Sequence, residues 1–173
     1  MPLNASEPVN ATIFTAAIIE ILEKDQACVN FINSEGWTPL MYAGLHGHVE
    51  FFLKLLKCDS NAVAKNKQGK TVLMLISSYG HTHLCKISRT FSISNNSSIK
   101  VKDYVNTRDD EGRTALHYAL EVNQLNCAEV LLENGADIYA EDKKKETPLS
   151  IAKSSSRKDD ALKLLKCFVP PTV

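Results

Sequence analysis

The chain has 173 residues, of which 44% are hydrophobic, and its 20 basic side chains balance 20 acidic ones. This length and this hydrophobic content suit one domain or one short solenoid with a continuous core, and they exclude a largely disordered chain. Because the formal net charge is zero, the chain as a whole offers no electrostatic footprint for nucleic acid or an anionic membrane surface. Such a partner would need a local patch.

The amino-terminal segment holds the longest apolar stretch, from Ile13 to Leu22, which Thr15 and Glu20 interrupt. It is shorter than the roughly 20 residues of a membrane span, and it lacks the basic leader and small-residue cleavage site of a signal peptide. The five cysteines form no CxxC pair, a spacing typical of reduced thiols. We therefore expect no membrane insertion by this segment and a cytoplasmic location.

A short motif built around threonine recurs along the chain. Its four copies are Gly36-Trp37-Thr38-Pro39-Leu40-Met41-Tyr42-Ala43, Gly69-Lys70-Thr71-Val72-Leu73-Met74, Gly112-Arg113-Thr114-Ala115-Leu116-His117-Tyr118-Ala119 and Thr147-Pro148-Leu149-Ser150-Ile151-Ala152. Thr can cap the first amide groups of a helix, and Pro loses no hydrogen bond at the first helical position. Gly47 and Gly80 then permit a left-handed turn into a second, antiparallel helix. Each copy therefore predicts a pair of short helices.

The threonines are 33, 43 and 33 residues apart, and this period with a T-P-L-H-x-A type of signature resembles the ankyrin repeat. The resemblance implies an all-α solenoid of stacked helix-turn-helix units with short β-hairpin-like fingers. We divide the chain into a degenerate amino-terminal cap (1–35), repeat A (36–68), repeat B (69–111), repeat C (112–144), a carboxyl-terminal capping repeat D (145–169) and a tail (170–173).

Two parts of the chain depart from the family pattern. In the cap, only Ala16–Lys24 aligns with a second helix. Repeat B has Ile76 where a small Ala is usual, Ser88 and Arg89 where two leucines are usual, and about ten extra residues near 92–102. Because this insertion is rich in Ser and Asn, we expect a solvent-exposed loop there.

The most metal-like string is His81-Thr82-His83-Leu84-Cys85. On a helix its two histidines would point to different faces, whereas metal ligands on helices prefer spacings of three or four. The resemblance implies structural roles for His81 and for His117, the latter bonding between neighbouring repeats. The chain contains no nucleophile elbow and no glycine-rich nucleotide motif. We therefore predict no enzyme activity, catalytic residue, metal site, cofactor or small-molecule substrate.

The candidate binding surface follows from the resemblance, which implies that the fingers and the ends of the first helices line one concave face. Partner-binding positions on that face are Trp37, Leu45, His46, Lys70, Tyr79, Arg113, Glu121 and Glu146. Trp, Tyr and Arg dominate the energetics of protein interfaces. Trp37, Tyr79 and Arg113 are therefore the predicted hot spot.

These features predict a protein-protein interaction scaffold or adaptor that binds another protein. The string from Gly36 to Ala43, the segment 61–68, the irregular repeat B and the final Pro148-Leu149-Ser150-Ile151-Ala152-Lys153 together resemble the germ-cell ankyrin, SAM and leucine-zipper scaffolds of the piRNA pathway. That resemblance implies a role on mitochondrial surfaces or germ granules, through parts outside this chain.

Two alternatives remain open. The chain could be a substrate- or partner-positioning domain of a larger regulatory enzyme, such as a GTPase-activating protein or a ubiquitin ligase. Direct RNA binding through Lys67, Lys70 and Lys143–Lys145 is a weaker alternative, since the charges on this face are mixed.

Overall fold

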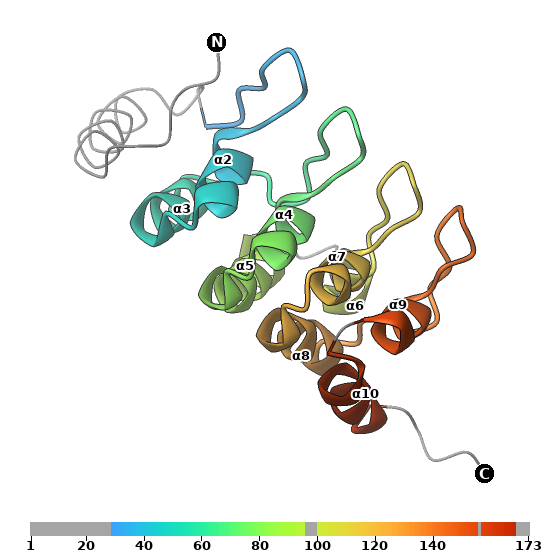
Figure 1. Ribbon diagram of the computed structural model, residues 1–173. Helices are drawn as coiled ribbons and strands as arrows, with labels where there is room; N and C mark the ends of the chain where they lie inside the picture. Colours follow the sequence, from blue (N-terminus) through green and yellow to red (C-terminus); the bar gives the residue numbers. More distant parts are fainter. Residues whose placement is uncertain (1–28, 96–99, 156, 169–173) are drawn as a thin grey trace, which may run out of the picture.

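The computed structural model describes residues 29–95, 100–155 and 157–168. In this part of the chain, helix pairs stack side by side, and from each pair a narrow finger projects to the same side (Figure 1). The all-α solenoid of repeats A to D is thus confirmed. Most of the predicted cap, including the helix expected at Ala16–Lys24, lies outside the described residues.

The helices form two parallel rows. The first helices of repeats A to D are α2 (Pro39–His46), α4 (Val72–Tyr79), α7 (Ala115–Glu121) and α9 (Pro148–Ser154), and the second helices are α3 (Val49–Lys57), α5 (Thr82–Asn95), α8 (Leu125–Glu133) and α10 (Lys158–Lys166). An additional short helix, α6 (Val101–Val105), follows α5. None of the helices within the described ranges is long and apolar enough to cross a bilayer.

The ends of the first helices have the geometry that the motif predicts. The Thr38 hydroxyl accepts a hydrogen bond from the Met41 amide at 3.2 Å, and Pro39 occupies the first turn. Gly47 ends α2 with a φ of 69°, in the left-handed region where a residue without Cβ is unstrained. In repeat C, Asn123 takes the same position with a φ of 57°, as Asn tolerates this conformation better than most residues.

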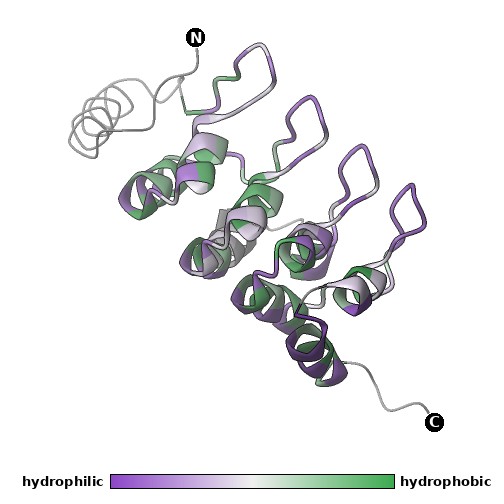
Figure 2. Ribbon diagram, viewed as in Figure 1, coloured by the Kyte–Doolittle hydropathy of each residue, from purple (hydrophilic) through white to green (hydrophobic). Residues whose placement is uncertain are grey.

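The core runs continuously between the two rows. Each first helix contacts the next one, from α2 through α4 and α7 to α9, and α3, α5, α8 and α10 contact one another in the same order. Leu40, Phe52, Leu116 and Leu131 are among the fully or almost fully buried side chains. Hydrophobic residues lie where the helices face one another, while the fingers are mainly hydrophilic (Figure 2). Neighbouring repeats therefore bury surfaces that one helix pair could not bury alone.

Gly44 explains the unusual Ile76 of repeat B. A Cβ atom added to Gly44 would lie 2.7 Å from Val72 Cγ2 and 3.1 Å from Ile76 Cγ1, distances shorter than van der Waals contact. Ile76 is completely buried. The large side chain of repeat B thus packs into space that the missing side chain of repeat A leaves open.

The prediction of a loop at 92–102 is wrong for those of its residues that the structure describes. Helix α5 continues through Asn95, and α6 begins at Val101. The reason is a tertiary contact: the Ser88 hydroxyl lies 2.6 Å from the Tyr104 hydroxyl, and both side chains are buried. Ser88 thus occupies a leucine position because it binds a tyrosine that α6 carries into the core.

Candidate functional site

Each finger is held by one Asn or Asp side chain that caps its own backbone. Asp109 Oδ1 accepts from the Glu111 and Arg113 amides at 2.9 and 2.8 Å. The same pair of bonds recurs, with amides two and four residues further on, at Asn33, Asn66 and Asp142. None of these four capping residues was predicted from the sequence. Their signal is an Asn or Asp five residues before every motif threonine.

The fingers are also joined to one another. The Lys67 amide donates to the Glu35 carbonyl at 3.0 Å, and the Asp110 amide donates to the Gln68 carbonyl at 3.1 Å. A third bond runs from Lys143 to Glu111 at 2.9 Å. The four finger tips therefore form one continuous rim. We call this rim, together with the carboxyl-terminal halves of the first helices, the finger face.

Two histidines stabilise the stack. His117 Nδ1 accepts from the Thr114 amide at 3.0 Å, so the ring proton is on Nε2, which donates to the Glu146 carbonyl of repeat D at 3.3 Å. Burial lowers the pKa of His117, against the Glu146 carbonyl, which favours the charged form. His81 Nε2 lies 3.0 Å from the Leu45 carbonyl of repeat A. Both rings thus join neighbouring repeats, as the resemblance implied for His117.

Trp37 of repeat A belongs to an aromatic cluster with Tyr42. Their ring centroids are 5.2 Å apart, and the side-chain amide of Asn33 donates a hydrogen bond to the Tyr42 hydroxyl at 2.9 Å. Tyr42 is 44% exposed, whereas Trp37 is half-buried against the core. Tyr42 was not among the predicted binding residues, although Tyr stands four residues after the motif threonine in repeats A and C.

Tyr79 lies at the end of α4 and is 59% exposed. Its ring stacks on His81, with centroids 6.4 Å apart, and His81 in turn reaches the Leu45 carbonyl. His46 is exposed beside His48, whose pKa is lowered by partial burial and by the neighbouring His46 and His81. The predicted residues Leu45, His46 and Tyr79 are therefore neighbours across repeats A and B.

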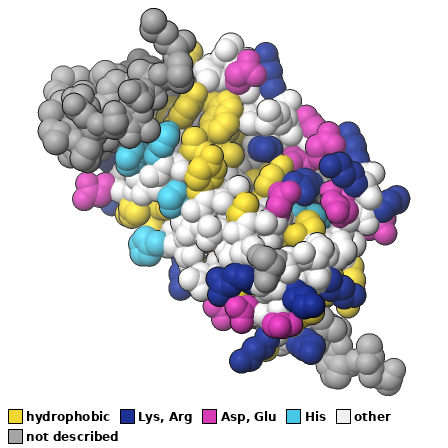
Figure 3. Space-filling view, in the orientation of Figure 1, with side chains coloured by type: hydrophobic (Ala, Val, Ile, Leu, Met, Phe, Trp, Pro, Cys, Tyr) yellow, Lys and Arg dark blue, Asp and Glu magenta, His cyan; other side chains and the backbone are white. Residues whose placement is uncertain are grey.

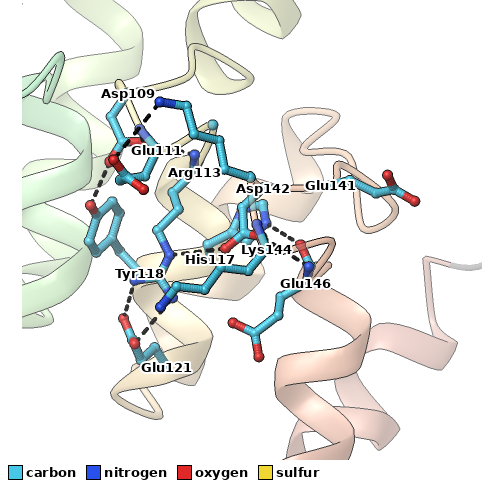
Figure 4. A network of polar contacts seen from close by, with 12 residues as sticks. Asp109, Glu111, Arg113, His117, Tyr118, Glu121, Glu141, Asp142, Lys144 and Glu146 are labelled. Carbon is cyan, nitrogen blue, oxygen red and sulfur yellow. Dashed lines mark hydrogen bonds and ion pairs between the residues drawn. The ribbon is translucent and has the colours of Figure 1, made fainter.

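Arg113 of repeat C is the centre of a charged cluster with Asp109, Tyr118, Glu121 and Asp142 (Figure 4). Its guanidinium donates to both Glu121 carboxylate oxygens, at 2.8 and 3.2 Å, and its Nε lies 3.5 Å from Asp142 Oδ2. The Tyr118 hydroxyl donates to Asp109 Oδ2 at 2.6 Å. Burial, and after it this hydrogen bond, raises the pKa of Tyr118. The guanidinium of Arg113 is thus already paired with carboxylates of the same chain.

The two remaining predicted residues lie on either side of this cluster. The Lys70 ammonium is 4.9 Å from the centre of the Tyr118 ring, and the Arg113 guanidinium is 5.3 Å from it. Glu146, in the finger of repeat D, has an exposed side chain, while its carbonyl receives the bond from His117. Tyr118, whose ring both Lys70 and Arg113 contact, was not among the predicted residues either.

The two ends of the finger face differ in character. Hydrophobic side chains and histidines gather toward the amino-terminal repeats, whereas Lys, Arg, Asp and Glu crowd toward the carboxyl-terminal repeats (Figure 3). Among the residues that the structure describes, no three His, Cys, Asp or Glu side chains are placed to hold a metal ion, His81, His83 and Cys85 included.

Comparison with known proteins covers nearly all of the described chain. Residues 53–142 and 91–170 match a family model of three ankyrin repeats, and residues 35–67 match the single ankyrin repeat. The E3 ubiquitin-protein ligase XB3 of Oryza sativa subsp. japonica is 33% identical over an alignment of 124 residues, which covers 63% of this chain and 25% of that protein. The putative E3 ubiquitin-protein ligase XBAT31 of Arabidopsis thaliana is 30% identical over an alignment of 116 residues, which covers 64% of this chain and 25% of that protein.

A human relative, the ankyrin repeat and IBR domain-containing protein 1, is 27% identical over an alignment of 150 residues, which covers 73% of this chain and 14% of that protein. The chain thus spans a quarter or less of the length of these relatives. Ankyrin repeats are non-catalytic modules that bind other proteins. With its four phased motifs, capped fingers and two rows of helices, this chain belongs to the ankyrin-repeat family.

Proposed function

We propose that this chain is an adaptor that binds a protein partner through the finger face, with Trp37, Tyr42 and Tyr79 as the anchors. The observation that carries the proposal is that large aromatic rings are exposed on a surface whose fingers are joined by hydrogen bonds. Tyr79 is 59% exposed and Tyr42 44% exposed, and the rim next to them is tied by hydrogen bonds between fingers. Rigid aromatic groups of this kind supply most of the binding energy in many interfaces.

Arg113 contributes less to this proposal than its residue type predicts. Its side chain is 18% exposed and is held by Glu121 and Asp142. A partner would have to break or share these contacts. We therefore place Arg113 at the edge of the binding surface and Tyr79 at its centre.

The test is affinity capture from cells with the wild-type chain and with Tyr79→Ala. We expect Tyr79→Ala to weaken partner binding by about 1 to 3 kcal/mol and to leave the thermal melt unchanged, because the ring is mostly exposed. Tyr139→Ala is the matched control, since Tyr139 is 56% exposed and lies between α8 and the finger of repeat D. Equal loss of the captured proteins by both variants, or by neither, would contradict the proposed surface.

A second candidate is a partner-positioning domain of a ubiquitin ligase, because two relatives are named as E3 ubiquitin-protein ligases. In that case the same face would hold the substrate of a catalytic part outside this chain. The reading frame beyond Val173 would decide this: a catalytic domain encoded there supports it, and a SAM domain supports the germ-cell scaffold instead. A cytoplasmic location, on mitochondrial surfaces or germ granules, remains part of the scaffold proposal.

A further inference from the structure

A hollow of about 420 Å³ lies on the finger face, among the three fingers that precede α4, α7 and α9. It is lined by Lys67, Gln68, Lys70, Asp109, Asp110, Glu111, Arg113, Tyr118, Asp142 and Lys144. Four of these side chains are cationic and four are acidic. The formal charges of the lining therefore sum to zero. Whether the hollow attracts a cationic or an anionic ligand depends on which side chains are already paired within the protein.

The acidic side chains are mostly engaged within the protein. Asp109 and Asp142 are buried, cap their fingers, and bind Tyr118 and Arg113 respectively. Burial raises the pKa of Asp142, but hydrogen bonds from the Glu146 and Lys144 amides and the charge of Arg113 outweigh it, so that the pKa is lowered. Glu111 lies 4.0 Å from the Lys143 ammonium. In the described part of the chain, Asp109 and Asp110 are the lining carboxylates without an ion pair, and of these two Asp109 is buried whereas Asp110 is exposed.

The lysines of the hollow are different. Within the described residues, Lys67, Lys70 and Lys144 make no ion pair with a carboxylate. Lys70 is held over the Tyr118 ring, a contact that fixes an ammonium without neutralising it. Asp109 is buried under its hydrogen bonds, so the unpaired charges that a ligand can contact are three ammonium groups and one carboxylate, that of Asp110. An anionic side chain that enters the hollow therefore meets more cationic than acidic groups.

We propose that this hollow binds an acidic segment of the protein partner, with one or two Asp or Glu side chains between Lys67, Lys70 and Lys144. The proposal rests on the proposed function and names the chemistry of the partner. The volume suits one or two side chains rather than a folded domain. Asp110 and Glu111 stand in the same hollow and would repel the continuous phosphates of a nucleic acid, and Lys143 and Lys145 are paired with Glu111 and Glu141.

The probe is a short fluorescein-labelled peptide of Glu, Ala and Gly, compared with the same peptide carrying Gln in place of Glu. Fluorescence anisotropy at low ionic strength should show binding of the Glu peptide and at least about tenfold weaker binding of the Gln peptide. A labelled oligouridine of similar length is measured beside them.

Three variants locate the binding. Lys70→Glu with Lys144→Glu should weaken the Glu peptide about tenfold or more. Lys163→Glu with Lys166→Glu changes the net charge equally on exposed positions of α10 and should leave the affinity within about twofold. Asp110→Asn removes the unpaired carboxylate and should strengthen binding several-fold, so a gain also tests the site if the first variant fails to fold.

The proposal is overturned if the Glu and Gln peptides bind equally, if the α10 variant loses as much as the hollow variant, or if oligouridine binds more tightly and competes. These outcomes separate the two proposals. If the Glu peptide does not bind but Tyr79→Ala loses partner capture, the proposed protein-binding function is still supported. Success here with no effect of Tyr79→Ala moves that function to the charged end of the face.

Discussion

Repeats A and C use the same three positions of the ankyrin motif in opposite ways. Trp37 and Arg113 precede the motif threonine, Tyr42 and Tyr118 follow it by four residues, and Leu45 and Glu121 follow it by seven. In repeat A the tryptophan ring packs against the tyrosine ring at an angle of 39°, while in repeat C the arginine lies over the tyrosine and binds the glutamate.

The difference shows how one backbone supports two kinds of surface. In both repeats the tyrosine hydroxyl bonds to the residue that caps the finger, Asn33 or Asp109. The charged groups around Arg113 mostly bind one another, so this cluster stabilises the packing of neighbouring repeats. The aromatic cluster leaves hydrophobic surface exposed, as Tyr42 shows, so it is the better anchor for a partner.

The largest expected effect comes from the two finger caps. Asp109 and Asn33 each make three hydrogen bonds of the same pattern, but Asp109 is buried and charged whereas Asn33 is partly exposed. We expect Asp109→Ala to lower the free energy of unfolding by about 2 to 4 kcal/mol, and Asn33→Ala by about 1 kcal/mol. Urea denaturation measures both. Equal losses would mean that burial does not distinguish the two clusters.

A smaller effect concerns pH. The pKa values of His117 and His48 are both lowered, His117 by deeper burial. The unfolded chain takes up protons near the ordinary pKa of 6.5, whereas the folded chain resists them. The contribution of these histidines to the free energy of unfolding is therefore fully present above about pH 7. It decreases as the pH drops below 6.5, by at most about 1.4 kcal/mol per pH unit and per histidine.

Two variants assign this pH dependence. His117→Gln should remove more of the difference in unfolding free energy between about pH 7 and pH 5.5 than His48→Gln does, because the buried ring resists protonation more strongly. Urea melts at the two pH values give the measurement. A larger change with His48→Gln would place the pH-sensitive part of the fold in repeat A.

The smallest effect concerns the finger of repeat D, which borders the charged cluster. Lys145 has a φ of 66° where repeats A, B and C have glycine. Lys145→Gly should raise the free energy of unfolding by about 0.5 kcal/mol, because the relief of left-handed strain exceeds the loss of the exposed ion pair with Glu141. Lys144→Gly is the control, since Lys144 is not among the positive-φ positions, and it should destabilise. A lower melting temperature for Lys145→Gly would refute the strain.

Local features of this fold were predictable from the sequence. Thr38, Pro39 and Gly47 act within one turn of their own positions, so the helix pairs and their reversals follow from residue type alone. The period of the motif then places the repeats, because each unit needs its neighbour to bury its hydrophobic side.

Contacts across repeats were not predictable in the same way. The segment at 92–95 has the composition of a loop, yet it is helical, and the buried Tyr104 that packs under α5 comes from the next helix. Arg113 was selected as a hot spot by residue type. Its pairing with Glu121 and Asp142 depends on how the finger folds over α7 and how repeat D approaches, which no single motif specifies.

The fit of Ile76 over Gly44 has a consequence for how such a chain can change. The residue that matches Gly44 in repeat C is Leu120, six residues after the motif threonine. An exchange of repeats A and C would bring Leu120 against Ile76 and crowd two large side chains into space that holds one. Shuffling or duplicating single repeats is therefore restricted, and the order of the repeats is maintained by packing as well as by descent.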